Sequence, residues 1–594
     1  MKKRCFFLLL LLCGFSQVHA QVAVNTDGSA PDNSAMLDIK STTKGLLIPR
    51  LTVYQRIQLP SPATGLLIYQ HGVDPGFYYN GGTPAVPNWK LVGDLGLGWN
   101  TTGNSGTDAT VNFIGTLDNV PLTFRVNNLP AGKIDHLTSN TSFGYQSLNS
   151  VTGGMINTAI GHQSLFSNTN GTWNVAIGHQ ALYANLEGYS NTAIGVQALY
   201  SNTSGIINLA IGMSALYSNL TGNDNVASGA RALYSNTSGN QNTATGTFAL
   251  EYNNTGIDNT AYGFNALNAN TIGNNNSATG SSALFSNTEG SGNTANGFQA
   301  HYSNTKGHDN SAYGFKALYS NLEGTFNTAI GDIALYSNRN ANGNTANGYA
   351  TLYSNYSGYN NTANGREAMY HNYGGTNNTA NGYSALYNNI NGSNNTATGG
   401  NSLLNNTGGD NNTGIGVNAG ISNTIGSNNT YIGYGTGGTN NISNSSAIGS
   451  GASVTASNTM VLGDPANSSF SVCIGRSHSA SGYKLAVAGK VICEELKVRL
   501  AASWPDYVFD AKYPLMSIDE LAKSIEREKH LPGLPSAEDV KKDGVSMGEM
   551  QAKLLEKVEQ LTLYIIQLQK QNDELTKKDA EIMQMINNSN NGNH

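Results

Sequence analysis

The sequence predicts a mainly β protein: a repetitive β-solenoid or β-roll of 17-residue units, then a small α+β C-terminal domain and a terminal coiled-coil helix. One 17-residue unit is written 17 times between residues 140 and 428 without insertion or deletion. Position 1 of the unit is Asn and position 5 is Gly in every copy. A fixed period of this kind indicates a repeat architecture. Near the C-terminus, apolar residues recur every seven residues, which predicts the coiled coil.

The length of the unit decides the kind of repeat. Seventeen residues are too few for the helix pairs of helical repeats and for a propeller blade. At about 3.3 Å per residue they close a turn of roughly 56 Å, the size of one solenoid coil. The abundant Asn, Gly, Ser and Thr disfavour long helices. The sequence leaves open whether the coils form a single-chain solenoid or an interchain β-roll.

Each position of the unit has an expected direction. Position 3, which is Ala in 15 copies, and position 5 are predicted to point inward, and the variable position 4 outward. Position 9 is usually Leu, as in Leu182 and Leu199, and should supply most of the apolar core. Stacked Asn residues at positions 1 and 12 should form hydrogen-bonded ladders. A coil this thin buries little apolar surface, which favours several chains around one axis.

The first 20 residues have the pattern of an export signal. Three basic residues precede a short apolar run and a small-residue cleavage site after Ala20. We therefore expect a secreted or cell-surface protein, with no transmembrane segment in the mature chain. Loss of Lys2, Lys3 and Arg4 changes the formal charge from −6 to −9, which argues against a nucleic-acid partner.

Residues 21–95 form a predicted N-terminal β-rich region, and residues 96–139 a β connector. The expected strands are residues 22–24, 45–48, 65–69, 111–115 and 121–126. The stretches 34–39, 43–50 and 76–80 resemble the opening segment of many fibre-like secreted proteins of Gram-negative bacteria.

Residues 429–482 form the predicted end of the rod. Their motifs Ser446-Ala447-Ile448-Gly449 and Met460-Val461-Leu462-Gly463, with the Asn-Thr-Ala-Ile-Gly of the repeats, resemble the head of trimeric autotransporter adhesins. That resemblance implies a left-handed parallel β-roll of three chains that binds host or matrix surfaces. Two features depart from the family: the unit is longer, and no run of alternating apolar strands forms a C-terminal membrane anchor.

Residues 483–545 form a charged C-terminal domain. It resembles the C-terminal domains of bacterial tail-fibre-like proteins and, in layout, the endosialidase-type intramolecular chaperone, which cuts itself at a Ser-Asp pair. The sequence contains no Ser-Asp pair, so we expect no self-cleavage. We expect a hairpin at residues 483–491, a helix near 517–529 with Ser517 as its N-cap, and a turn at 530–536 that includes a structural His530.

Residues 546–588 are predicted to form a coiled coil. Its core comprises Leu at the d positions and Val, Ile and Asn at the a positions: Leu554, Val558, Leu561, Ile565, Leu568, Asn572 and Leu575. β-branched residues at a favour two strands, whereas the adhesin resemblance implies three, and we predict a homotrimer. The alternative is one amphipathic helix packed on its own domain. Whether Cys473 and Cys493 pair is left open.

A row of aromatic residues is the candidate ligand site. Position 10 is Tyr in ten copies, and a stacked row could hold a surface glycan or a protein, because Tyr joins apolar area to a polar tip. The alternative is that the rings pack between coils as structure. The candidate residues are Tyr183, Tyr200, Tyr217, Tyr234, Tyr319, Tyr336, Tyr353, Tyr370 and Tyr387.

No catalytic, cofactor or metal site is predicted. His162 and His179 share position 6 of adjacent copies and should stack, but no Cys or carboxylate recurs with them. Four aspartates near unit ends are interpreted as turn residues rather than calcium ligands: Asp224, Asp258, Asp309 and Asp410. The repeats also lack a recurrent pair of acidic residues, which a polysaccharide-degrading fibre would need.

These observations favour a secreted, fibrous, adhesin-like cell-surface protein that is not an enzyme. Many weak contacts along repeated coils would bind a surface by avidity. The first alternative is a phage-tail-fibre-like or purely structural surface fibre without a receptor. A polysaccharide-degrading fibre is the less favoured alternative.

Overall fold

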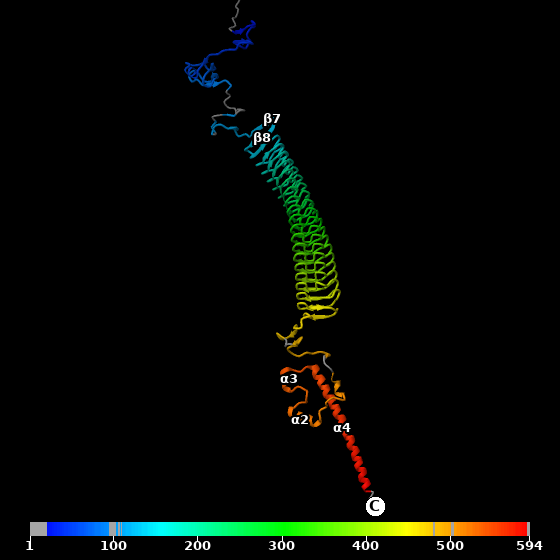
Figure 1. The fold of residues 1–594 in the computed structure, drawn as a ribbon. Coiled ribbons are helices and arrows are strands. Elements are labelled where there is room, and N and C mark those ends of the chain that lie inside the picture. The colour runs from blue at the N-terminus through cyan, green and yellow to red at the C-terminus, as the bar shows by residue number, and fades with distance from the viewer. Residues whose placement is uncertain are drawn as a thin grey trace, which may run out of the picture. The chain divides into compact units, whose positions relative to one another are not determined.

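The computed structural model describes residues 21–93, 103–104, 107–108, 110–478, 482–499 and 504–590. The predicted export signal and part of the predicted connector lie outside these residues. The chain divides into two compact units, Met1–Thr221 and Gly222–His594, and each is considered by itself. The fold is mainly β, as predicted, with β-solenoid coils and few helices (Figure 1).

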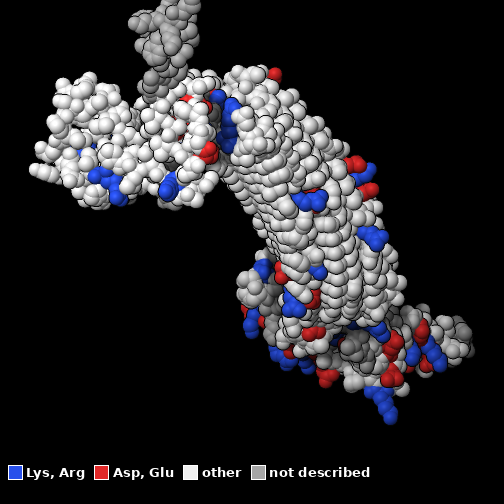
Figure 2. Space-filling model, turned by 90° about the horizontal axis from the view of Figure 1, so that it is seen from above, with Lys and Arg blue, Asp and Glu red and all other residues white. Residues whose placement is uncertain are grey.

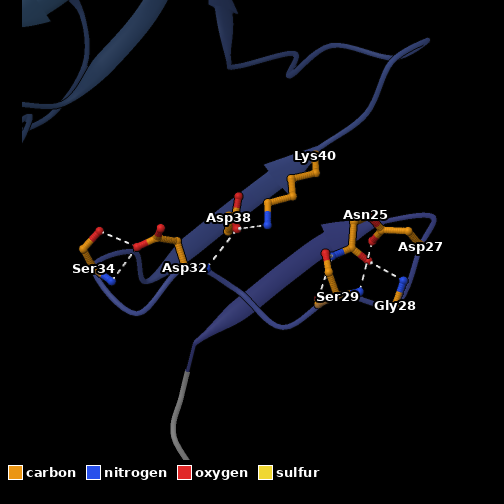
Figure 3. A network of polar contacts seen from close by, with 8 residues as sticks. All are labelled: Asn25, Asp27, Gly28, Ser29, Asp32, Ser34, Asp38 and Lys40. Atoms are coloured by element: carbon orange, nitrogen blue, oxygen red, sulfur yellow. Dashed lines mark hydrogen bonds and ion pairs between the residues drawn. The ribbon is translucent and has the colours of Figure 1, made fainter.

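The N-terminal region begins with two parallel strands joined by a polar loop (Figure 3). The Asn25 side-chain amide donates to the Ser29 carbonyl oxygen at 2.7 Å, and the Asp32 carboxylate accepts from the backbone and hydroxyl of Ser34. The Ser34 hydroxyl and backbone N–H hold the pKa of Asp32 below its usual value. These short-range bonds close the loop. The strands are β1 (Val22–Asn25) and β2 (Leu37–Lys40).

A four-stranded sheet follows. Its strands are β3 (Arg50–Leu51), β4 (Leu67–Gln70), β5 (Gly76–Asn80) and β6 (Trp89–Leu91). Strands β3 and β4 pair in parallel, whereas β4 with β5 and β5 with β6 pair antiparallel. Helix α1 (Val53–Ile57) begins with a capping box between Thr52 and Gln55.

Two predicted strands in this part of the chain are wrong. Residues 45–48 form no strand, because Leu46 and Leu47 are exposed and the ladder begins at Arg50. Residues 111–115 form no strand either, because the backbone N–H groups of Val111 and Asn112 both donate to the Asp108 carbonyl in a turn. The predicted strands at residues 22–24, 65–69 and 121–126 are confirmed, with small changes of boundary.

A hairpin covers the first coil of the solenoid. Strands β7 (Leu122–Val126) and β8 (Leu129–Asp135) are antiparallel, and β8 pairs antiparallel with β9 (Asn140–Phe143). Within each compact unit, the strands from β9 onward pair in parallel, each with its equivalent one repeat later, as in Thr192 with Leu209. The hairpin therefore covers an edge that would otherwise be open to other chains.

Each repeat after the first contributes one three-residue strand at positions 2 to 4 of the unit, and the first contributes β9. These strands are β10 (Thr158–Ile160), β11 (Val175–Ile177), β12 (Thr192–Ile194), β13 (Leu209–Ile211), β14 (Val226–Ser228), β15 (Thr243–Thr245), β16 (Thr260–Tyr262), β17 (Ser277–Thr279), β18 (Thr294–Asn296), β19 (Ser311–Tyr313), β20 (Thr328–Ile330), β21 (Thr345–Asn347), β22 (Thr362–Asn364), β23 (Thr379–Asn381), β24 (Thr396–Thr398) and β25 (Thr413–Ile415). Backbone bonds between coils continue outside the strands, as from Leu199 N–H to the Ala215 carbonyl at 2.9 Å.

The core of each coil lies within one chain. Position 3 (Ala193) and position 9 (Leu199) are fully buried, as predicted, and so is position 8 (Ala198), which the sequence reasoning missed. The Asn ladders are confirmed. At position 12, Asn202 Nδ2 donates to Asn185 Oδ1 at 2.8 Å and to the Gly205 carbonyl at 3.0 Å. The coils thus combine small apolar side chains with satisfied buried amides.

The invariant Gly at position 5 has no room for a side chain. In Gly280, φ is +123°, and a Cβ would lie 2.6 Å from the carbonyl oxygen of Gly297 in the next coil. The left-handed backbone and the close approach of the next coil therefore both favour Gly. The prediction that position 5 points inward is replaced by this close approach between coils. Positions 7, 9 and 17 also have left-handed backbones, as in Gln197, Leu199 and Ile207.

One coil has Gly in place of the usual core Ala and Leu, and a large side chain of the next coil compensates. Positions 3 and 9 of the last repeat are Gly414 and Gly420, and Tyr431 of the following coil is fully buried against Gly420. A Cβ on Gly420 would lie 2.6 Å from the Tyr431 ring. The large ring therefore fills the volume that Gly420 leaves.

The solenoid continues past the repeats to residue 462. The strands are β26 (Thr430–Ile432), β27 (Gly437–Gly438), β28 (Ser446–Ile448), β29 (Ser453–Val454) and β30 (Met460–Leu462). Beyond it, β31 (Val472–Ile474) pairs in parallel with β32 (Leu485–Val487). The predicted hairpin at residues 483–491 is therefore wrong, because its one strand pairs with an earlier segment. Cys473 and Cys493 are both free thiols.

The C-terminal region is helical. It contains η1 (Pro505–Phe509), α2 (Ile518–Glu528), α3 (Ala537–Asp543) and α4 (Met547–Asn590). Ser517 caps α2 in a capping box with Glu520, as predicted. The short helix α3 was not predicted; Ser536 caps it through the same arrangement with Asp539.

Candidate functional site

The predicted row of aromatic residues forms stacked ladders. In the first unit, rings stack from Phe166 through Tyr183 and Tyr200 to Tyr217, with centroids 5.0–5.1 Å apart and nearly parallel planes. In the second unit, seven rings stack with centroids 4.9–5.2 Å apart. These are Phe285, Tyr302, Tyr319, Tyr336, Tyr353, Tyr370 and Tyr387. Tyr302 occupies position 10 and so belongs to the predicted row, but it was not among the nine named candidate residues.

The ladder rings are half-buried. Burial and the neighbouring tyrosines raise the pKa of Tyr319 and Tyr353, so these phenols stay neutral at physiological pH. Arg231 lies 4.5 Å from the ring centre of Tyr234, the ladder residue of its own coil. Stacking gives the ladder a structural role, and the rings stay partly exposed.

A second aromatic row is more exposed and was missed. Position 6 is outward and carries aromatic residues 45–52 % exposed: Phe264, Phe298, Phe315, Tyr349 and Tyr383. Phe298 and Phe315 stack with centroids 5.7 Å apart. Position 6 varies among copies, so no single residue type marked it in the sequence. The only available signal was that position 6 lies two residues after the outward position 4 in every copy, which would have indicated an exposed row.

The two rows adjoin each other. The Lys316 Nζ lies 5.2 Å from the Phe315 ring centre at position 6 and 5.5 Å from the Tyr319 ring centre at position 10. Arg366 lies 5.7 Å from Tyr349 and 5.8 Å from Tyr383. We call the five position-6 residues and the seven-ring ladder of the second unit the aromatic face.

Amides border the exposed rings. In three copies an outward Asn at position 4 precedes the aromatic residue by two positions, as in Asn296 with Phe298 and Asn347 with Tyr349. The Asn364 side chain donates to Asn381 Oδ1 at 2.8 Å, one coil further on. Charged residues are sparse over the coils (Figure 2). The aromatic face therefore combines flat apolar rings with neutral hydrogen-bonding groups.

The remaining repeat candidates are structural. His162 and His179 stack at 5.2 Å, as predicted. Asp224, Asp258 and Asp309 have left-handed backbones at unit ends, as turn residues do, and the carboxylate of Asp410 accepts the Ser393 N–H at 2.7 Å. Within the described residues, no group of three or more His, Cys, Asp or Glu side chains could hold a metal ion.

One buried histidine was not anticipated. His301 occupies position 9, where most copies have Leu, and is fully buried. Its Nε2 lies 3.1 Å from the Asn321 amide, and its Nδ1 has no partner. Burial lowers the pKa of His301 to about 3, so the ring is neutral.

The predicted coiled-coil residues all lie on α4 as one uncovered apolar seam. The six apolar residues Leu554, Val558, Leu561, Ile565, Leu568 and Leu575 are 47–57 % exposed, and Asn572 is exposed with them. The other side of the helix contacts its own domain, where Glu556 accepts hydrogen bonds from the hydroxyls of Tyr507 and Tyr513. The helix is therefore confirmed, and pairing with another helix stays a prediction. His530, beside this region, contacts only the adjacent Leu531 carbonyl among the hydrogen bonds of the described residues.

Comparison with known proteins gives one match. Residues 23–107 match the family model described as a phage tail like trimerisation region. No curated protein and no solved structure matches the chain. The match covers the stretches 34–39, 43–50 and 76–80, which were predicted to resemble the opening segment of fibre-like secreted proteins. The tail-fibre resemblance of the C-terminal domain stays a prediction. Across the described part of the chain, no helix has the length and apolarity needed to cross a membrane.

Proposed function

We propose that the chain is an exported, homotrimeric surface fibre that adheres to glycans through the aromatic face. The N-terminal match to a trimerisation region and the uncovered seam of α4 support three copies. The leader pattern of residues 1–20 supports export. The protein has no proposed enzymatic activity.

The observation that carries adhesion is the repeated exposure of rings beside amides. A sugar presents apolar C–H groups on one side and hydroxyls at its rim, which a flat ring and an adjacent Asn can both contact. A single such contact is weak, but the five position-6 rings of the aromatic face, multiplied by three chains, would bind a polymer by avidity.

The test replaces the five position-6 aromatic residues with Ser in the full chain. Ser281 already occupies this position in one copy, so the fold should tolerate the change. A control chain carries Thr to Ser at position 2 of four of the same copies: Thr260, Thr294, Thr345 and Thr379. Binding to immobilised polysaccharides should fall at least tenfold in the aromatic variant and stay unchanged in the control. Equal glycan binding by both chains would overturn the role of the aromatic face. No glycan binding by the native fibre would leave a purely structural fibre.

A further inference from the structure

The C-terminal region has almost no core of its own. Among residues 504–589, the buried apolar side chains are Pro505, Val508 and Tyr564. Apolar residues of α2 and of the loops around it, including Met516 and Leu531, are substantially exposed. A region of this size needs a larger buried core or a partner to be stable.

The exposed apolar surface includes a groove of about 730 Å³ beside α4. One wall is formed by Leu554, Val558 and Leu561, which belong to the heptad seam. The opposite wall comes from Met516 and Leu521 and from the loop that contains Leu531. The groove and the first turns of the seam are thus one continuous apolar surface.

The domain is fixed to α4 without covering the seam. The Tyr564 hydroxyl donates to the Met516 carbonyl oxygen at 2.6 Å, and Glu556 accepts from the Tyr513 hydroxyl at 3.1 Å. Glu556 lies on the side of the helix away from the a and d positions. These contacts hold the loop at the flank of the seam, where a second helix would lie.

We propose that this groove receives α4 of a second copy of the chain, so that each C-terminal domain grips a neighbour's helix. A helix that packs on Leu554, Val558 and Leu561 has to lie along the groove, because the same three side chains form its wall. A short unrelated peptide in the groove would leave the remaining heptads of α4 exposed. This inference rests on the proposed trimer and adds that residues outside the coiled coil determine its strength.

The experiment compares chains of residues 21–594. Light scattering over a dilution series measures their mass in solution, and circular dichroism checks their folding. Leu531→Asp places a charge in the groove wall but outside the heptads, and Leu531→Ala is the milder form if the first fails to fold. Val540→Asp, on α3 outside the groove, is the control, since Leu531 and Val540 are 41 % and 36 % exposed. We expect the Leu531 variants to dissociate at concentrations at least tenfold higher than the native chain, and Val540→Asp to behave as the native chain does.

The outcomes separate this inference from the proposed trimer. A native trimer whose assembly is unchanged by both Leu531 variants would overturn the groove inference and leave the trimer intact. Equal weakening by Leu531→Asp and Val540→Asp would also overturn it, because the effect would then not be specific to the groove. A native chain that is monomeric would overturn both.

Discussion

The coils and the C-terminal region use opposite ways of burying apolar surface. In each coil, Ala193, Ala198 and Leu199 or their equivalents are fully buried within one chain. In the C-terminal region, the apolar residues of the α4 seam are about half exposed. The coils therefore complete their core with their own neighbours in sequence. The C-terminal region leaves apolar surface exposed, and we propose that other copies cover it.

This difference corrects the argument from the thinness of the coil. The sequence favoured several chains around one axis because each coil seemed to bury too little apolar surface. The structure shows that buried Asn ladders and backbone bonds between coils supplement the small core. The case for assembly rests instead on the N-terminal trimerisation match and the α4 seam.

The largest effect within the coils is expected from Tyr431→Ala. The fully buried ring fills the space beside Gly420, so its removal leaves a cavity that should cost about 3–5 kcal/mol, as for other large aromatic truncations. Hydrogen exchange should show loss of protection in the coils around residue 431. The exposed Tyr434→Ala is the control, and equal protection in both variants would contradict a packing role.

Gly280→Ala should cost about 3 kcal/mol, because the left-handed backbone is strained for Ala and the new Cβ would meet the Gly297 carbonyl. Thermal unfolding followed by circular dichroism would measure the loss, with Ser281→Ala as the neighbouring control. If the Gly280→Ala variant unfolds at the same temperature as the native chain, the coils do not approach each other closely at Gly280.

Asn202→Leu tests whether the buried ladder stabilises a single chain. The change leaves Asn185 Oδ1 and Asn219 Nδ2 without their ladder partner, at about 1–3 kcal/mol for an unsatisfied buried group. Urea unfolding should show the loss, and the exposed Ser204→Ala should not change stability. A stability gain in Asn202→Leu would show that apolar packing, and not the ladder, holds the coils together.

His301→Leu should give the smallest effect, and one that depends on pH. The folded pKa is about 3 and an unfolded His titrates near 6.5, so below pH 6.5 the unfolded state binds more protons and stability falls as pH falls toward 3. At pH 5 the native chain should have lost about 2 kcal/mol relative to pH 7. The variant should lack this loss, and the exposed His308→Leu should retain it.

Most of the coil architecture could be predicted from the sequence, because a 17-residue period fixes which side chains stack. The inward Ala193 and Leu199 and the Asn202 ladder follow from that period. The exposed row at position 6 could not be predicted in this way, because its residue type varies. The strand expected at residues 45–48 failed because a short apolar run, here three apolar side chains after Gly45, forms a strand only when a partner strand is present.

The central claim is that the coils fold within one chain and that the ends of the chain assemble the copies. It is tested most directly by the mass in solution of residues 110–478, measured by light scattering, beside the chain from residue 21 onward. The β7–β8 hairpin caps one end of this fragment, and Phe470 lies against Gly463 near the other. We predict a folded monomer for the fragment and a trimer for the longer chain. A fragment that folds only as a trimer, or not at all, would contradict the claim.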